Sequence, residues 1–349
     1  MRKLSSRFLA MSLALVMLLA FCASCSSDKS TTTPPSAPAD SEKETSENAP
    51  TRTPIDIHWA AGSSSGACYI TGTVMGGVLS ELYDGYTVTP EVTTGGVENA
   101  KMLVAGDAQF ISVQGDDAIS VNNNTRGWVD VPEATDILRY VGCANGTKMN
   151  LIAPLDDDSI NSFEDVKGKR VGILAGSTYN YGWAYLLEAY GMSESDFASV
   201  EVMSRPDLCN AIQDGSIDFI FDITPDNQPA HQEAAFAIGG YKLLSIPDDV
   251  RDKLKELNPA YQDVVIEADC YNGNDEAQTC GLYNIWCTSK DADYQMIYDI
   301  LTCFYDNAET FKAAHPLAGN ASDEEVLNNQ VVPWHPAAEQ FYKDRGILK

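Results

Sequence analysis

Lysine and arginine are scarce in this sequence. The 349 residues include 23 of them, against 50 aspartates and glutamates, which gives a formal net charge of −27. Affinity for the phosphate backbone of DNA or RNA comes from clustered cationic side chains. We therefore expect no nucleic acid partner. The acidity is typical of a solvated, exported surface.

Histidine is scarce as well. The only four are scattered at His58, His231, His315 and His335, and the seven cysteines after residue 25 have no CxxC or Cys/His spacing of a zinc site. We expect no metal and no cofactor. Of these cysteines, only Cys270 and Cys280 bracket a short polar loop, whose ends could close into a disulfide.

The sequence also lacks an apolar run long enough to cross a bilayer. The run Phe8–Phe21 has 14 residues, whereas a membrane-spanning helix needs about 20. Basic residues precede it and Cys-Ala-Ser-Cys follows it, which is the layout of a lipoprotein signal peptide. We expect residues 1–24 to be removed and Cys25 to be lipidated. Ordinary secretion with cleavage near Ala23 is the alternative.

Residues 25–53 follow as a lipidated cysteine and a tether. Apart from the cysteine they are almost all Ser, Thr, Pro, Ala, Glu, Asp and Lys, without apolar periodicity, so they cannot bury a core. Two acyl chains suffice for stable anchoring. We expect an extracytoplasmic protein tethered to the outer face of a membrane, or a periplasmic one.

From Ile55 onwards, short apolar strands alternate with helical periods, as in repeated β-loop-α units of an α/β fold. The remaining 296 residues are enough for two lobes. The predicted strands are 55–60, 87–93, 108–114, 170–174, 200–204 and 217–222. Polar loops follow them, including Gly115-Asp116-Asp117, and the predicted helices include 69–83, 97–105, 178–190 and 206–214.

Three of these loops are rich in Gly, Ser and Thr: Gly62–Gly66, Thr94–Asn99 and Ala175–Thr178. A loop of this kind that opens a helix exposes backbone N–H groups at the positive end of the helix dipole, where an anion fits. The sequence therefore predicts a carboxylate-bearing ligand between the lobes. It has no P-loop or in-register GxGxxG, and we do not expect a nucleotide.

Several motifs resemble one family in particular. They are Thr94-Gly95-Gly96-Val97-Glu98-Asn99, Val113-Gln114-Gly115-Asp116, Ala314-His315-Pro316 and Pro333-Trp334-His335-Pro336. In their order and spacing they resemble the TAXI class of substrate-binding receptors, which serve tripartite ATP-independent periplasmic (TRAP) transporters. The resemblance extends from about Ile55 to Lys349.

The resemblance implies a periplasmic-binding-protein type 2-like α/β fold, with two lobes, a hinge and a ligand cleft between them. Lobe 1 would comprise residues 54–146 and 281–349, and lobe 2 residues 147–280. The function implied is capture of a small organic anion, of glutamate, glutamine or dicarboxylate type, by Venus-flytrap closure. Delivery would be to the fused permease of a TRAP transporter.

By the same resemblance, the first lobe would bind the ligand through Ser64, Ser65, Gly66, Tyr69, Gly96, Val97, Glu98 and Gln114, and the second through Ser177, Thr178 and Tyr179. Backbone and hydroxyl donors would hold carboxylate oxygens, and Tyr69 would cover the ligand. Gln114 and Glu98 could recognise an amine or amide.

Two alternatives remain open. The first keeps solute binding but makes the protein the receptor of an ABC importer or of a sensor kinase. The second is a thiol enzyme, with Cys68 in a Gly-rich turn at a helix N-terminus, where the pKa of its thiol could be lowered. Because the sequence places no general base beside Cys68, we expect no enzyme.

Overall fold

The computed structural model describes residues 54–349 except 65, 84, 130, 315–317, 319 and 320. The predicted signal peptide, Cys25, the tether, Ser65 and His315 lie outside the described residues. The described residues belong to one compact unit, Pro50–Lys349. Within them, no helix combines the length and the apolar character needed to cross a membrane.

The first part of the chain forms three parallel strands and the helices that follow them. These elements are β1 (Ile55–Gly62), α1 (Ala67–Leu82), β2 (Tyr86–Val92), α2 (Gly96–Ala105), β3 (Phe110–Gln114) and α3 (Gly115–Asn122). Strand β1 pairs in parallel with both β2 and β3. The carboxyl ends of the three strands therefore meet at one sheet edge, as predicted from their polar loops.

The middle of the chain repeats this arrangement. Its elements are β5 (Arg170–Leu174), a π-helix (Thr178–Trp183) continuing into α4 (Ala184–Tyr190), β6 (Ser199–Met203), α5 (Arg205–Gln213), β7 (Phe219–Thr224), α6 (Pro229–Ile238) and α7 (Asp248–Leu257). Strand β5 pairs in parallel with β6 and β7. We call the part around β1–β3 the first lobe and the part around β5–β7 the second lobe.

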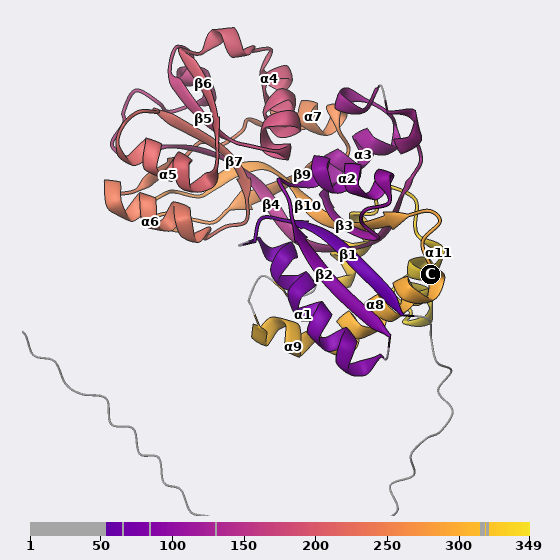
Figure 1. Cartoon of the computed structure of the whole chain (residues 1–349). Helices are drawn as coiled ribbons and strands as arrows, with labels where there is room; N and C mark the ends of the chain where they lie inside the picture. The colour runs from indigo at the N-terminus through magenta and orange to yellow at the C-terminus, as the bar shows by residue number, and fades with distance from the viewer. Residues whose placement is uncertain (1–53, 65, 84, 130, 315–317, 319–320) are drawn as a thin grey trace, which may run out of the picture. The chain divides into compact units, whose positions relative to one another are not determined.

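Two long strands join the lobes, β4 (Leu138–Pro154) and β10 (Ala277–Ser289). Strand β4 pairs with β10 as far as Lys148 and with β7 from there to Ile152. The result is a single ten-stranded sheet in the order β2-β1-β3-β10-β4-β7-β5-β6, in which β8 (Tyr241–Leu243) adds to β4 and β9 (Gln262–Ile266) to β10. Figure 1 shows β4 and β10 running between the two lobes. The exact domain boundaries expected above stay a prediction.

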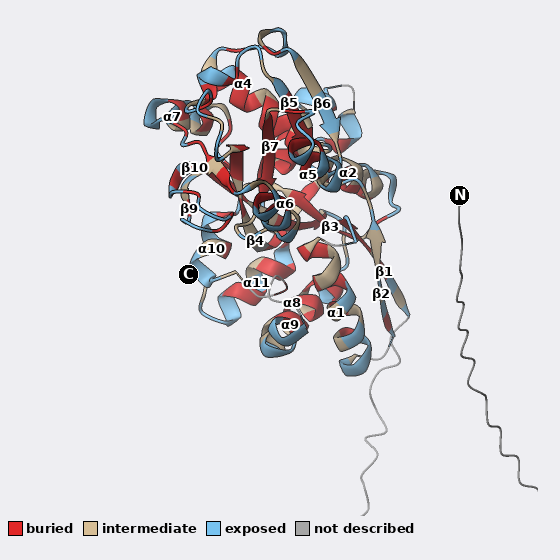
Figure 2. Ribbon diagram, turned by 90° about the vertical axis from the view of Figure 1, so that its left-hand side faces the viewer, coloured by how far each residue is buried: buried red, intermediate tan, exposed pale blue. Residues whose placement is uncertain are grey.

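The last helices cover the first lobe. They are α8 (Tyr294–Asp306), α9 (Ala308–Ala314), α10 (Asp323–Asn328) and α11 (Pro336–Asp344). Short 3₁₀ turns lie at Arg126–Trp128, Pro132–Ala134, Phe163–Val166 and Glu194–Asp196. The apolar stripe of α8, which includes Ile297, Ile300 and Phe304, is buried in the core. In Figure 2 the central strands are buried, and the exposed residues lie mainly on outward helix faces and loops. The expected α/β class with two lobes is confirmed.

One local expectation was wrong. Gly115-Asp116-Asp117 was predicted as a loop, but these residues begin helix α3. Two acidic residues in the first turn favour a helix start, because they face the positive end of the helix dipole. Ala118 and Val121 then bury one face of the helix in the core.

Candidate ligand-binding site

A cavity of about 450 Å³ lies where the carboxyl ends of the strands of both lobes face each other. The first lobe contributes the loops after β1 and β2 and the end of β3, and the second contributes the loops after β5, β6 and β7. The crossing strands β4 and β10 add Asn145, Thr147 and Asn284. Small-molecule sites in proteins are commonly of this size.

Five of the residues expected to bind ligand line this cavity. They are Gly66, Gly96 and Gln114 from the first lobe and Ser177 and Thr178 from the second. Gly96 has no room for a side chain, because an added Cβ would lie 2.0 Å from Oδ2 of Asp117. The loops of the two lobes also approach closely at Gly176, where an added Cβ would lie 2.8 Å from the carbonyl oxygen of Thr94.

Four described first-lobe residues on the predicted list, Ser64, Tyr69, Val97 and Glu98, do not line the cavity. Ser64 is exposed, and its neighbour Ser63 lines the cavity instead. Tyr69 and Val97 pack against the hydrophobic core on the flanks of α1 and α2. The first residues of both helices line the cavity. Because each residue of a helix is rotated relative to the one before it, Tyr69 and Val97 lie on other faces of α1 and α2.

Glu98 and Tyr179 have other roles. Oε2 of Glu98 accepts hydrogen bonds from the backbone N–H and hydroxyl of Thr94, at 2.6 and 2.8 Å. These bonds lower the pKa of Glu98, whose carboxylate closes the turn before α2. Tyr179 lines a second, more open cavity of about 540 Å³ on the π-helix and α4.

Arg205 was missed from the sequence. Among the described residues that line the cavity, Arg205 is the only one with a charged side chain. It is the first residue of α5. Its Nε and Nη2 donate to the buried carboxylate of Asp222, at 2.7 and 3.1 Å. The segment Ser204-Arg205-Pro206 between a predicted strand and a predicted helix was the signal that could have revealed it.

Asp222 holds Arg205 in place from inside the second lobe. Its Oδ2 is also 2.8 Å from Nε2 of the buried His231. Burial by itself would raise the pKa of Asp222, but the charge of Arg205 and the hydrogen bond with His231 outweigh it and lower the pKa. Asp222 is therefore ionised. Its two oxygens accept from Nε and Nη2 of Arg205, and Nη1 of Arg205 has no hydrogen bond to any described residue.

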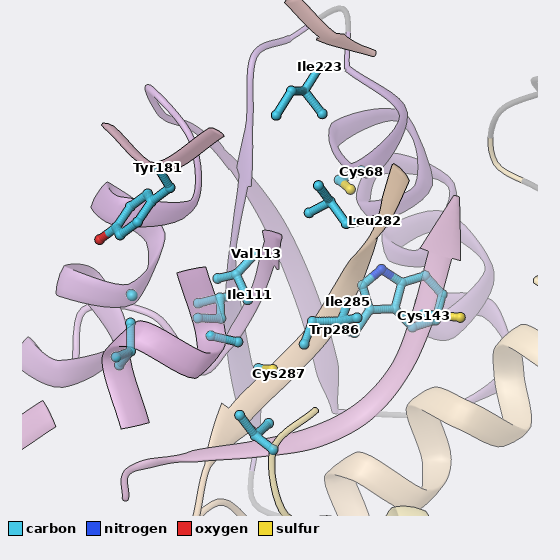
Figure 3. Packing of buried hydrophobic residues seen from close by; sticks show 14 of the residues in the cluster. Cys68, Ile111, Val113, Cys143, Tyr181, Ile223, Leu282, Ile285, Trp286 and Cys287 are labelled. Atoms are coloured by element: carbon cyan, nitrogen blue, oxygen red, sulfur yellow. The ribbon is translucent and has the colours of Figure 1, made fainter. Parts of the chain in front are cut away.

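Cys68 lines the cavity near the start of α1, yet its environment is apolar. Burial raises the pKa of its thiol, against a smaller opposing effect of a hydrogen bond with Ser112. Figure 3 shows the thiol on its helix among core side chains that include Leu282. His58, the histidine nearest to Cys68 in the sequence, has its Nδ1 2.8 Å from Oε1 of Glu91.

The predicted disulfide is absent: Cys270 and Cys280 are both free thiols, as are the other five cysteines of the described residues. Sγ of Cys270 donates to the carbonyl of Glu267 at 2.9 Å, in a turn held by Asn274. Cys280 is buried within β10, opposite Asp263 of β9. The polar loop between the two cysteines leads into the strand β10, which pairs with β9 from Ala277 onwards.

Beside the cavity, the lobes meet around α3. Ser177 donates to Oδ2 of Asp117 at 2.5 Å, and Tyr261 donates to Oδ2 of Asp116 at 2.8 Å. Burial raises the pKa of Asp116 to about 6. Burial, followed by the charge of Asp116, raises that of Asp117 well above its ordinary value. Within the described residues, no group of three His, Cys, Asp or Glu side chains is placed to hold a metal ion.

Solved structures that resemble this chain include three bacterial proteins. XAC2383 from Xanthomonas citri is 9% identical, with a TM-score of 0.49, over 84% of this chain and 99% of that one. The periplasmic aliphatic sulphonate binding protein SsuA from Escherichia coli is 14% identical, with a TM-score of 0.48, over 83% and 79%. A structure from a study of glutathione import via GshT and the cystine ABC importer TcyBC of Streptococcus mutans is 14% identical, with a TM-score of 0.48, over 78% and 100%.

The family comparison covers most of the described chain. The model of the NMT1-like family matches residues 59–346, which include both lobes and every residue that lines the cavity. The chain belongs to the NMT1-like family.

Proposed function

We propose that this protein is an extracytoplasmic receptor that captures a small organic anion between its two lobes and delivers it to a membrane importer. The proposal rests on the cavity at the facing strand ends, which residues of both lobes line. Arg205 is the only charged residue among its described lining residues. The protein acts by binding, without catalysis or a cofactor.

Several groups are available to an anion there. Nη1 of Arg205 is not used by Asp222, and guanidinium groups bind carboxylates with charge-assisted hydrogen bonds. Helices α1 and α2 begin at the cavity after Gly66 and Gly95, neither of which provides a side-chain cap. Because no described side chain caps these helix starts, their first N–H groups can donate to a ligand.

Ligand binding would favour closure of the lobes. A ligand that touches both lobes at once has a higher affinity for the closed arrangement than for an open one, and so shifts the population toward it. Compaction in small-angle scattering on addition of a tight ligand would support this mechanism, and unchanged dimensions would contradict it.

The membrane partner is an importer of the ABC or the TRAP type. The names of the solved structures above agree better with the ABC alternative than with the TRAP resemblance, and the choice rests on experiment. A neighbouring gene for an ATPase would identify an ABC importer, and one for a fused permease a TRAP transporter. Lipidation at Cys25 is part of the proposal, and mass spectrometry of the membrane-bound protein would test it.

The test of binding is a thermal-shift screen of residues 26–349 against amino acids, other organic acids, sugars and metal ions. A ligand at 100 times its dissociation constant stabilises the native state by about 2.7 kcal/mol, which is a measurable shift. We expect a shift with at least one organic anion. A shift with sugars or metal ions alone would refute the proposal.

A further inference from the structure

Two adjacent carboxyl groups of the first lobe are buried where it meets the second lobe. They belong to Asp116 and Asp117, in the first turn of α3, and neither residue is exposed to solvent. Ser177, just before the π-helix of the second lobe, donates to Asp117 at 2.5 Å. Tyr261, whose ring packs against Tyr185 of α4, donates to Asp116 at 2.8 Å. Each carboxyl group therefore has a hydrogen-bond partner that the second lobe supplies.

Nothing in these surroundings favours two negative charges. Among the described residues, no basic side chain pairs with Asp116 or Asp117. Oδ1 of Asp117 is buried and has no hydrogen bond to any described residue. Two ionised carboxylates side by side, without water and without a cation, would repel each other. The pair is therefore suited to hold a proton as long as the lobes stay together.

The other titratable groups around α3 do not neutralise the pair. Tyr261 and Tyr181 interact with it from the second lobe, and burial raises the pKa of both phenols, so that they stay neutral. The titratable groups of the elements packed against α3 are engaged elsewhere or exposed: Glu98 of α2 with Thr94, Arg126 of the 3₁₀ turn with Glu188, Arg139 of β4 with Asp136, Lys148 of β4 with Asp226, Tyr283 of β10 with Glu325, and Lys101 of α2 at the surface.

The neutral form of Asp117 fits its place. Burial, and then the charge of Asp116, raises the pKa of Asp117 well above its ordinary value. The hydrogen bond with Ser177 survives protonation, because a serine hydroxyl can accept as well as donate. If the lobes separated, Ser177 and Tyr261 would move away and water would solvate both carboxyl groups. Their pKa values would then return toward the ordinary range, and both groups would ionise at neutral pH.

We propose that closure of the lobes around an anion takes up a proton from the solvent at the pair Asp116 and Asp117, and that opening releases it. This inference rests on the proposed receptor function and adds a regulation of the same site. By linkage, the proton and the anion each raise the affinity of the protein for the other. Acidification therefore favours capture of the anion, and a rise in pH favours its release.

Calorimetric titration counts the proton directly. Residues 26–349 are titrated at pH 6.5 with glutamate, glutamine, lactate and ethanesulfonate, none of which titrates near this pH, in two buffers of different ionisation enthalpy. For each probe that binds, the difference in heat should correspond to uptake of about one proton. Equal heats in the two buffers, or proton release, would overturn the inference and leave the receptor function intact.

The outcome is also defined if none of these four probes binds. The organic anion with the largest thermal shift then takes their place. If the screen finds no organic anion, the receptor function fails and the inference fails with it.

The pH dependence of affinity assigns the proton to the pair. One linked proton changes an affinity about tenfold per pH unit, so the wild type should bind the tightest probe about 10 to 100 times more weakly at pH 7.5 than at pH 5.5. Asp117→Asn keeps the size of the side chain and its hydrogen bond with Ser177 but cannot ionise. Its affinity should change less than about threefold over the same range.

Asp107→Asn is the matched control, because Asp107 is an exposed residue of the same lobe outside the cavity. This variant should keep the pH dependence of the wild type. The same pH dependence in Asp117→Asn as in the wild type would contradict the inference. If Asp117→Asn does not fold, the proton count decides, since it needs no variant.

Discussion

Ser177 of the second lobe donates a hydrogen bond to the buried carboxyl group of Asp117 of the first lobe, with 2.5 Å between Oγ and Oδ2. The other oxygen of Asp117, Oδ1, is buried without a hydrogen bond to any described residue. Asp116 lies next to it, so that two carboxyl groups share the helix start at which the lobes meet. The contact between the lobes therefore includes groups that are costly to ionise.

Removing this hydrogen bond should weaken the native state. Ser177→Ala leaves Oδ2 of Asp117 buried without its donor, and loss of one partner of a buried polar group costs about 1 to 3 kcal/mol. Urea unfolding should show a lower free energy of unfolding by that amount. Ser195→Ala is the control, because Ser195 is exposed and its hydroxyl forms a hydrogen bond with that of Ser193 at the surface. Equal stability of the two variants would show that the contact between the lobes contributes nothing.

The raised pKa of Asp116 predicts the direction in which the stability of the protein changes with pH. Its native-state pKa of about 6 lies above its ordinary value of 3.8. The native state therefore binds the proton of Asp116 more tightly than the unfolded state does. The stability that this proton contributes is fully present below pH 4 and is lost as the pH rises through 6. Asp116→Asn imitates the protonated form, with Tyr261 and Asp117 still facing it.

The measurement is the free energy of unfolding of Asp116→Asn and of the wild type at pH 4 and pH 7.5. We expect the variant to gain about 1 to 3 kcal/mol over the wild type on going from pH 4 to pH 7.5. Taking the difference between the two proteins cancels carboxyl groups whose pKa values are lowered, such as Asp222 and Asp218, which act in the opposite direction. A difference independent of pH would refute the assignment.

A further contact between the lobes is a hydrogen bond from Nε1 of Trp128 to the hydroxyl of Tyr181, at 2.9 Å, with both side chains buried. Tyr181→Phe leaves the indole N–H without an acceptor and should cost about 1 to 3 kcal/mol of stability. Thermal or urea unfolding measures it. Tyr294→Phe, at an exposed ring, should change stability by less than about 0.5 kcal/mol. If Tyr181→Phe changes stability as little as Tyr294→Phe does, the hydrogen bond contributes no net stability.

The cysteines give a prediction that needs no variant. All seven cysteines of the described residues are free. If the protein of residues 26–349 is unfolded in the absence of a reductant, a thiol reagent should therefore modify seven groups. The same count should be obtained after reduction. A count of five before reduction and seven after it would restore the disulfide expected from the polar loop between Cys270 and Cys280.

Local patterns predicted much of the fold. Strand β3 and helix α2 were found from apolar periodicity, and the polar residues after β1, β2 and β3 identified the sheet edge at which the cavity lies. These features depend on neighbours in sequence. The joining of the lobes depends on distant pairings, such as Gln114 with Asn284 and Lys148 with Thr224, which no local pattern specifies.

The site was predicted less completely for a related reason. Backbone groups at Gly96 and hydroxyls at Ser177 follow from their place at helix starts, and these residues do line the cavity. Side-chain direction cannot be read so easily, and Tyr69 turned out to pack against the core. Arg205 faces the cavity because Asp222, 17 residues later, holds it there.

The most direct test of the receptor function is the affinity of Arg205→Gln for the organic anion that gives the largest thermal shift. Arg170→Gln is the matched control, since Arg170 pairs with Asp218 through the same two guanidinium nitrogens but lies outside the cavity. After circular dichroism has shown that both variants fold, calorimetric titration should give an affinity about 10 to 100 times weaker for Arg205→Gln and an unchanged one for Arg170→Gln. Wild-type affinity in Arg205→Gln would show that the anion does not bind in this cavity as proposed.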